Sequence, residues 1–397
     1  MVKSLGFVGV LLVFLLAGCG GGGGGDSSFY PIYGFDVGPY IDGQTGGDPV
    51  PPDQLRARVE LVTPYAEWVR TYGCTGGFEE AGSIAHEFGL KAAMGAWLSA
   101  DTAQNRREID NLKVALAAGQ VDMAIVGSET QFSGSLPEDQ LIAYIKEVRD
   151  YVRQDLGKTT PVTTAEPQDT WLEHPKLVPA CDVVFYNCYP YWNGVSVADA
   201  TADLDACWSE LHTTYPDKEL IVSETGWPAC GDIIGSAAPS PANQQAYFHA
   251  FVAWARSKGI KYFWFEAFDE AWKAPPPQEA CFGILRNQFT NVPPYGSPGD
   301  IKGRAWNVSF GDCRVALYIK VGDGWYNKPS WEYPLTHIDG EGNWVCKTPA
   351  ANDIYATEIR AYLIPEGYTP PQAGGEAEIP NVQDLLIHSY AKAVVSR

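Results

Sequence analysis

Eight short apolar runs alternate with helix-like stretches between residues 33 and 294, and this alternation constrains the fold more than any other feature of the chain. Strands that alternate with helices build parallel βαβ units. Eight such units close into a (β/α)8 TIM barrel of about 250 residues, with functional side chains at the carboxyl ends of the strands. We therefore predict the α/β class, with strands at residues 33–37, 68–72, 91–97, 123–127, 161–165, 183–189, 220–224 and 262–268.

The chain has 397 residues, more than one barrel requires, and its last third follows a different pattern. The Pro- and Gly-rich residues 293–298 are typical of a linker, so we assign residues 30–295 to the barrel. Residues 301–371 alternate in polarity and predict a small all-β accessory module. Residues 372–397 are acidic and then amphipathic, and we interpret them as a C-terminal tail.

Three tryptophans of the accessory module, Trp325, Trp331 and Trp344, have two interpretations. They could form a platform on which sugar rings stack, or they could belong to the core of the module. The core explains them better, because large aromatic side chains are usually buried.

The N-terminus has the features of an export signal. Residues 1–18 combine Lys3 with an apolar run that is too short to span a bilayer. This run ends in Leu16-Ala17-Gly18-Cys19, which resembles a bacterial lipobox, so we expect Cys19 to be lipidated. The Gly-rich residues 19–29 would then form a flexible tether between this lipid anchor and the barrel. We expect the protein to be anchored in the bacterial cell envelope, at the outer membrane, in the periplasm or at the cell surface. An ordinary cleaved signal peptide with an incidental cysteine is the alternative.

Charge and composition exclude several classes of partner. The formal net charge of −20 would repel nucleic acid, so we expect a neutral or cationic partner. The hydrophobic content of 45% is typical of a globular protein. We also expect the protein to be a monomer and to need no cofactor. The six histidines show no HExxH spacing and the cysteines form no CxxC pair, so no metal site is predicted.

Eight cysteines follow Cys19, and an even count in an oxidising compartment indicates disulfide bonds. The sequence does not determine how they pair. Our first expectation is a bond between Cys313 and Cys346 inside the accessory module. Two further candidate pairs, which would tie together parts of the barrel, are Cys230 with Cys281 and Cys181 with Cys207.

Two glutamates lie at the predicted carboxyl ends of strands. Glu129 follows residues 124–128, and Glu224 follows residues 220–223. A glutamate at the end of an apolar strand loses hydration, which indicates a functional role. Glycoside hydrolysis provides one, because it needs a carboxylic acid to protonate the leaving oxygen and a carboxylate that faces the anomeric carbon. A salt-bridged structural pair is the alternative.

Further stretches around these glutamates occur in the order found in a known family. They are Tyr33-Gly-Phe-Asp-Val-Gly-Pro-Tyr40, Val69-Arg-Thr-Tyr-Gly73, Ile125-Val-Gly-Ser-Glu129, Asn187-Cys-Tyr-Pro-Tyr-Trp192, Ile221-Val-Ser-Glu-Thr-Gly-Trp-Pro228 and Phe265-Glu-Ala-Phe-Asp-Glu-Ala-Trp-Lys273. Over residues 33–290 the chain thus resembles glycoside hydrolase family 17, the β-1,3-glucanase family of retaining barrel enzymes. The last two stretches are the most specific.

The resemblance implies a role for each matching residue. Glu129 matches the acid/base of the family and Glu224 its nucleophile, acting on β-1,3-glucan by double displacement. Glu270 and Lys273 match charged groups beside them, and a cationic lysine would favour an ionised nucleophile.

Other positions of the resemblance are expected to contact substrate or to orient catalytic groups. Arg70 and Tyr72 would orient the nucleophile by hydrogen bonds, while Tyr189 and Trp227 would pack on glucose rings. Two carboxylates, Asp36 and Glu266, have two interpretations. They could bind sugar hydroxyls, or they could have a structural role inside the barrel.

One position departs from the family. The residue before the acid/base is usually Asn, which binds the sugar 2-hydroxyl, and here it is Ser128. Slower chemistry, another substrate and loss of activity all remain open. The alternatives to a hydrolase are therefore a β-glucanosyltransferase acting on the same substrates and a catalytically impaired surface lipoprotein that binds glycan.

Overall fold

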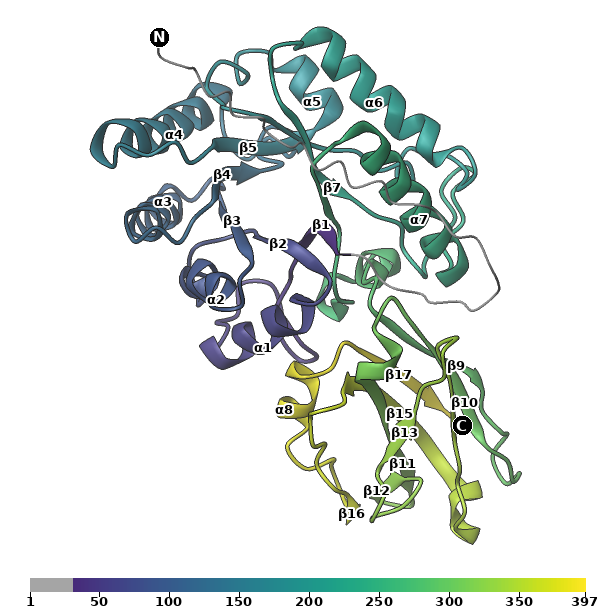
Figure 1. Ribbon diagram of the computed structural model, residues 1–397. Helices are drawn as coiled ribbons and strands as arrows, with labels where there is room; N and C mark the ends of the chain where they lie inside the picture. The colour runs from purple at the N-terminus through teal and green to yellow at the C-terminus, as the bar shows by residue number, and fades with distance from the viewer. Residues whose placement is uncertain (1–30) are drawn as a thin grey trace, which may run out of the picture.

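The computed structural model describes residues 31–397, which form a barrel and a module of antiparallel sheets (Figure 1). Eight parallel strands close the barrel in the order β1 to β8, so the predicted (β/α)8 fold is confirmed. The strands are β1 (Ile32–Asp36), β2 (Ala66–Thr71), β3 (Lys91–Ala96), β4 (Met123–Ser128), β5 (Val162–Pro167), β6 (Val184–Asn187), β7 (Leu220–Thr225) and β8 (Tyr262–Trp264).

Helices surround the barrel (Figure 1), and two hydrophobic clusters hold it together. One cluster joins the strands to the helices. The other consists of strand residues such as Phe185 and Phe263, whose rings meet edge to face at 5.5 Å and fill the barrel interior. The helices are α1 (Pro52–Val62), α2 (Ala81–Glu87), α3 (Thr102–Ala117), α4 (Glu138–Asp150), α5 (Gln168–Glu173), α6 (Ala200–Thr214) and α7 (Pro241–Lys258).

The barrel ends earlier than predicted. Strand β8 ends at Trp264, four residues before the predicted end. The next strand, β9 (Arg286–Asn291), pairs antiparallel with β10 (Ile301–Trp306) in the C-terminal module. The predicted linker at residues 293–298 was therefore wrong. Its prolines and glycines form the turn between these two strands.

The C-terminal module contains two sheets. A three-stranded sheet has the order β14–β10–β9, and a larger sheet has the order β16–β12–β11–β15–β17 with β13 paired to β11. Residues 372–397 are not a separate tail, because β17 pairs with β15 along six positions. The remaining elements are β11 (Cys313–Val321), β12 (Gly324–Lys328), β13 (Leu335–His337), β14 (Asn343–Cys346), β15 (Ala356–Pro365), β16 (Gly374–Glu376), α8 (Val382–Ile387) and β17 (Ala391–Ser396).

The tryptophans of the module do not form a platform together. Trp325 and Trp344 are each 1% exposed, whereas Trp331 is 56% exposed. The first two therefore belong to the core of the module, as the second interpretation predicted.

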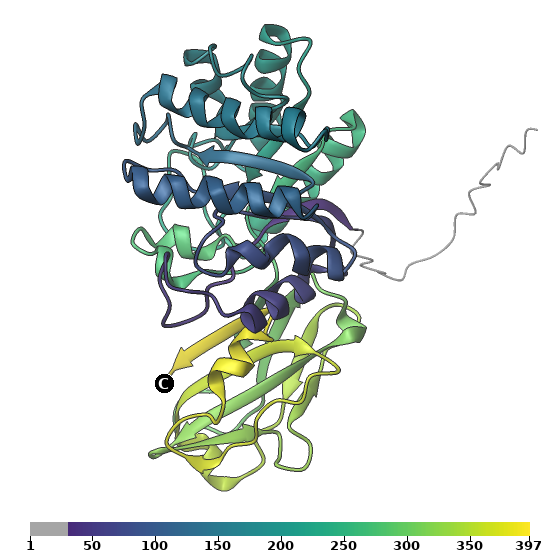
Figure 2. The ribbon, with the colours of Figure 1, turned by 90° about the vertical axis from the view of Figure 1, so that its left-hand side faces the viewer.

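The module packs against the barrel beside helix α1, as both views show (Figures 1 and 2). The buried Arg58 of α1 donates to the carbonyl of Ser389 at 2.7 Å, and its guanidinium lies 3.5 Å above the ring of Phe268. The hydroxyl of Tyr65 accepts a hydrogen bond from the amide of Ser309 at 3.0 Å. The two hydrogen bonds join the module to the barrel, one at α1 and the other just after it.

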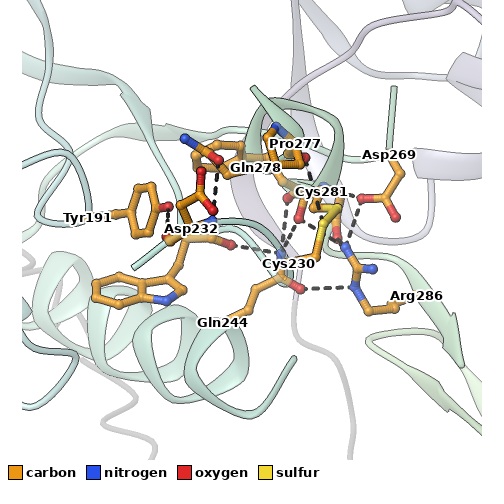
Figure 3. The surroundings of a disulfide bond; sticks show 12 residues. Tyr191, Cys230, Asp232, Gln244, Asp269, Pro277, Gln278, Cys281 and Arg286 are labelled. Carbon is orange, nitrogen blue, oxygen red and sulfur yellow. Dashed lines mark hydrogen bonds and ion pairs between the residues drawn. A yellow bond between two sulfur atoms is a disulfide. The ribbon is translucent and has the colours of Figure 1, made fainter. Parts of the chain in front are cut away.

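The cysteine pairs agree only in part with expectation. Cys230 and Cys281 form the expected disulfide, which ties the loop after β7 to the loop after β8 (Figure 3). In the same region the guanidinium of Arg286 bridges to Asp269 at 2.7 Å. This cross-link fixes two loops at the carboxyl end of the barrel.

The other two expected pairs were wrong. Cys207 of α6 bonds to Cys188, which follows β6, while Cys181 precedes that strand and is free. Cys313 of β11 and Cys346 of β14 lie on strands of different sheets, and both are free and buried.

No helix between residues 31 and 397 is both long and apolar enough to cross a lipid bilayer. The expected lipidation site Cys19 lies outside the described residues.

Candidate active site

Polar side chains collect at the carboxyl ends of the barrel strands. Asp36 and Ser128 are the last residues of β1 and β4, and Glu224 is the penultimate residue of β7. Arg70 of β2 is in register with Asp36, and Asn187 of β6 is in register with Glu224. The barrel topology thus brings residues that are far apart in sequence to one end of the sheet.

Arg70 is the central cation of this group and is fully buried. Its Nη1 lies 2.7 Å from Oε1 of Glu224 and 3.2 Å from Oδ1 of Asp36. Its Nη2 donates to Oγ of Ser128 at 3.2 Å. Burial alone would lower the pKa of Arg70, but the negative charges around it raise that pKa, so the guanidinium stays charged.

Both carboxylate oxygens of Glu224 accept hydrogen bonds. Arg70 donates to one oxygen, and the hydroxyl of Tyr189 donates to the other at 2.9 Å. The side chain is 8% exposed, so little water competes with these donors. A carboxylate held at both oxygens has a defined orientation toward a reacting carbon.

Glu129 occupies a different environment. Its backbone is in the left-handed region with φ of 51°, directly after β4. The amide of Asn187 donates to its Oε1 at 2.7 Å. Burial, and then the charge of Glu224, raises the pKa of Glu129 to about 7. At neutral pH this side chain can therefore donate a proton, as a general acid must.

Lys273 forms a second charged cluster after β8. Its ammonium lies 2.7 Å from Oε2 of Glu266 and 2.6 Å from Oε2 of Glu270. Burial raises the pKa of Glu266. Burial also acts to raise the pKa of Glu270, but the charge of Lys273 and several hydrogen bonds outweigh this effect, so the pKa of Glu270 is lowered. A Cβ at Gly38 would lie only 2.2 Å from the carboxyl group of Glu270, so this position has no room for a side chain.

Residues 34–283 match the BtgE/BtgC glycoside hydrolase domain family. The chain belongs to this family. A glucan 1,3-beta-glucosidase of Schizosaccharomyces pombe is 30% identical over 254 residues, which cover 60% of this chain and 79% of that protein. A protein of Aspergillus clavatus named "Probable glucan endo-1,3-beta-glucosidase btgC" is 31% identical over 206 residues, 46% of this chain. The chain spans only 29% of the length of that Aspergillus relative.

Structural comparison agrees with the BtgE/BtgC assignment. The family 17 β-1,3-glucanosyltransferase of Rhizomucor miehei has a TM-score of 0.57 and 27% sequence identity, and the match covers 64% of this chain and 92% of that enzyme. The resemblance to glycoside hydrolase family 17 is confirmed, and the chain is a glycoside hydrolase by family.

One predicted contact of this glycoside hydrolase was wrong. Trp227 is fully buried and its indole donates to the carbonyl of Ala238 at 3.1 Å, so it cannot pack on a sugar ring. Its ring packs between Tyr191 and Tyr247 instead.

The remaining candidates lie at the site, but not all of them face solvent. Asp36 and Glu266 are fully buried beside cations, in agreement with the structural interpretation. The ring of Tyr72 lies 4.6 Å from the guanidinium of Arg70, and its buried hydroxyl has no hydrogen-bond partner among residues 31–397.

Sequence reasoning missed two polar residues of the site. Asn187 contacts Glu129, and Glu166 of β5 accepts hydrogen bonds from the loop that follows Glu129. Asn187 is the last residue of β6 and Glu166 is the penultimate residue of β5, so a polar side chain at a strand end was the signal that could have found them.

Exposed aromatic side chains were also missed. They lie in loops after β3, β4, β6 and β8, the end of the barrel that carries the site. Aromatic faces exposed there are suited to packing on sugar rings. They are Trp97 (50% exposed), Phe132 (65%), Trp192 (36%) and Trp272 (36%).

One group in the described part of the chain has the spacing of a metal site, namely Cys188, Asp203 and Cys207. The two sulfur atoms are joined in a disulfide, so neither is available as a thiolate ligand.

Proposed function

We propose that the protein is a retaining glycoside hydrolase that acts on β-1,3-glucan. The S. pombe relative is named as a glucan 1,3-beta-glucosidase, and a mutant of the R. miehei enzyme is in complex with laminaritriose. The exposed aromatic side chains around the site supply faces for a neutral glucan chain.

One observation carries the proposed mechanism, namely the different environments of the two glutamates. The oxygens of Glu224 are held by Arg70 and Tyr189, whereas the pKa of Glu129 is raised to about 7. Two carboxyl groups with such different surroundings can take separate acid and nucleophile roles.

In the first step, an oxygen of Glu224 bonds to the anomeric carbon as the glycosidic C–O bond breaks. Glu129 gives its proton to the leaving oxygen, so the departing sugar carries a neutral hydroxyl. In the second step, Glu129 takes a proton from water, whose oxygen bonds to the anomeric carbon and releases Glu224. Two inversions leave the product in the β configuration.

Azide rescue tests both roles. Glu224→Ala should abolish hydrolysis, and azide in place of the lost carboxylate should then convert an activated β-glycosyl fluoride to the α-azide. Glu129→Ala should retain the first step on aryl β-glycosides, and azide should again yield the β-azide, here from the trapped glycosyl-enzyme. First-formed products in the α configuration from the unmodified enzyme, followed by NMR, would exclude the retaining mechanism.

A transglycosylase is the second candidate, because the R. miehei structure is described as a β-1,3-glucanosyltransferase. In that reaction a sugar hydroxyl replaces water in the second step. Incubation with laminari-oligosaccharides distinguishes the two, since a transferase yields products longer than the substrate. Binding of these sugars without any turnover would instead indicate a glycan-binding protein.

The place of action is also a proposal. The lipobox-like residues 16–19 and the glycines that follow support attachment to the bacterial cell envelope through lipidated Cys19. Such an anchor would hold the enzyme near glucan that reaches the cell.

A further inference from the structure

A buried carboxylate on the strand next to β4 contacts the turn that follows Glu129. Glu166, the penultimate residue of β5, is fully buried. Its Oε1 accepts from the backbone amide of Gln131 at 3.0 Å, and its Oε2 accepts from the amide of Phe132 at 3.2 Å. The two oxygens of this carboxylate therefore accept hydrogen bonds from two successive amides of one turn.

The same strand also holds the start of that turn. The carbonyl of Ala165 accepts from the amide of Glu129 at 2.7 Å, and the carbonyl of Glu129 accepts from the amide of Ser133 at 2.9 Å. Two adjacent residues of β5 thus hold both the first and the middle part of the turn. Glu129 itself has φ of 51°, and this left-handed region is unfavourable for a residue with a side chain. External contacts are needed to hold it there.

We propose that Glu166 is a positioning residue for Glu129, fixing the turn at residues 130–132 so that the carboxyl group of Glu129 stays directed at the glycosidic oxygen. The inference rests on the proposed function, in which Glu129 is the acid/base. Glu166 is too deeply buried to touch substrate. Its role is exerted through the backbone of the turn.

The charges around the two groups add a second effect. Glu166 faces His174 at the end of α5 as well as the turn amides, and Glu129 faces Glu224 of β7, Arg70 of β2 and Glu166. Burial raises the pKa of Glu166 to about 7, so Glu166 is charged on the alkaline side, where its charge raises the pKa of Glu129. A residue that merely supports the fold would not change the pH at which Glu129 loses its proton.

The test compares substrates that need acid catalysis with substrates that do not. In Glu166→Gln, one backbone amide faces an NH₂ group in place of an oxygen. We expect kcat/KM on laminari-oligosaccharides to fall about 10- to 100-fold, and kcat/KM on a 2,4-dinitrophenyl β-laminaribioside to change less than about 3-fold. The alkaline limb of the pH profile should move to lower pH, because the negative charge is lost.

The matched control is Asp182→Asn. Asp182 accepts from the amide of Val162 at 2.8 Å, at the opposite end of β5, and pairs with Arg153 at 2.7 Å. This variant should lose stability without changing the ratio between the two substrates or the alkaline limb. If Glu166→Gln fails to fold, Glu166→Asp serves instead. It keeps the charge and shortens the reach, so the selective loss should persist while the alkaline limb stays in place.

Equal losses on both substrates, or no loss on either, would overturn the positioning role. The parallel variant Glu129→Ala separates this result from failure of the proposed function. If kcat/KM on laminari-oligosaccharides falls selectively in Glu129→Ala but not in the Glu166 variants, only the positioning role of Glu166 is wrong. If Glu129→Ala loses both activities equally, the acid/base assignment fails.

Discussion

The side-chain amide of Asn187 lies 2.7 Å from Oε1 of Glu129, and its carbonyl oxygen accepts from the hydroxyl of Ser223. Ser223 precedes Glu224 in β7. The two glutamates are therefore connected through one asparagine and one serine. This link orients the acid/base relative to the strand that carries the nucleophile.

Replacement of Asn187 by Ala should weaken catalysis and shift its pH dependence. The hydrogen bond from Asn187 lowers the pKa of Glu129, so its loss should move the alkaline limb of kcat/KM to higher pH. A hydrogen bond to a charged group is worth about 1.5–3 kcal/mol, so kcat/KM should fall about 10- to 100-fold. The shift is opposite to that expected for Glu166→Gln, and pH profiles of both variants check it.

The unmodified enzyme should lose activity as the pH rises above about 7. Glu129 must carry a proton in the first step, and its pKa is raised to about 7 by burial and by Glu224. Protonated Glu129 is abundant below that pH and is lost above it, so kcat/KM should decline about tenfold per pH unit on the alkaline side. An alkaline limb near the ordinary pKa of a glutamate would contradict this assignment.

Ser128→Asn tests the departure from the family. The hydroxyl of Ser128 accepts from Arg70 at 3.2 Å, and the carbonyl of an asparagine could accept the same hydrogen bond while its amide reaches the sugar 2-hydroxyl. One added hydrogen bond in the transition state is worth about 1 kcal/mol, so kcat/KM on β-1,3-gluco-oligosaccharides should rise several-fold. A fall would indicate that the site has been rebuilt around serine.

Lipidation at Cys19 predicts where the protein is found. The intact protein should partition into the detergent phase, because several acyl chains on one cysteine bind a bilayer firmly. Cys19→Ala should leave it in the aqueous phase or unprocessed, as fractionation and immunoblotting would show. A mature soluble protein that lacks Cys19 would contradict the anchor.

Much of the barrel and its two glutamates could be predicted, because each depends on a local pattern. Glu129 and Glu224 both lie at the carboxyl end of an apolar strand, and burial of a carboxylate there is costly unless it has a role. Asn187 was missed because an uncharged amide at a strand end carries a weaker signal.

Features that depend on long-range contacts could not be predicted. Cys181 precedes strand β6 and Cys188 follows it, and either could have been the partner of Cys207 in α6. Three-dimensional packing decides which end of β6 lies against α6, and Cys207 bonds to Cys188. Trp227 lies inside the fold, and residue type alone does not reveal which way an aromatic ring turns. Strand β17 pairs with β15, about thirty residues earlier in the chain, through backbone groups that leave no mark in the sequence.

The contact between Arg58 and the carbonyl of Ser389 limits how the chain can be shortened. A truncation after residue 371 would remove α8 and β17, and with them the hydrogen-bond acceptor of the buried Arg58 side chain. It would also uncover the edge of β15. A catalytic fragment cut at that boundary would therefore tend to aggregate, and a useful expression fragment has to retain the chain through Arg397.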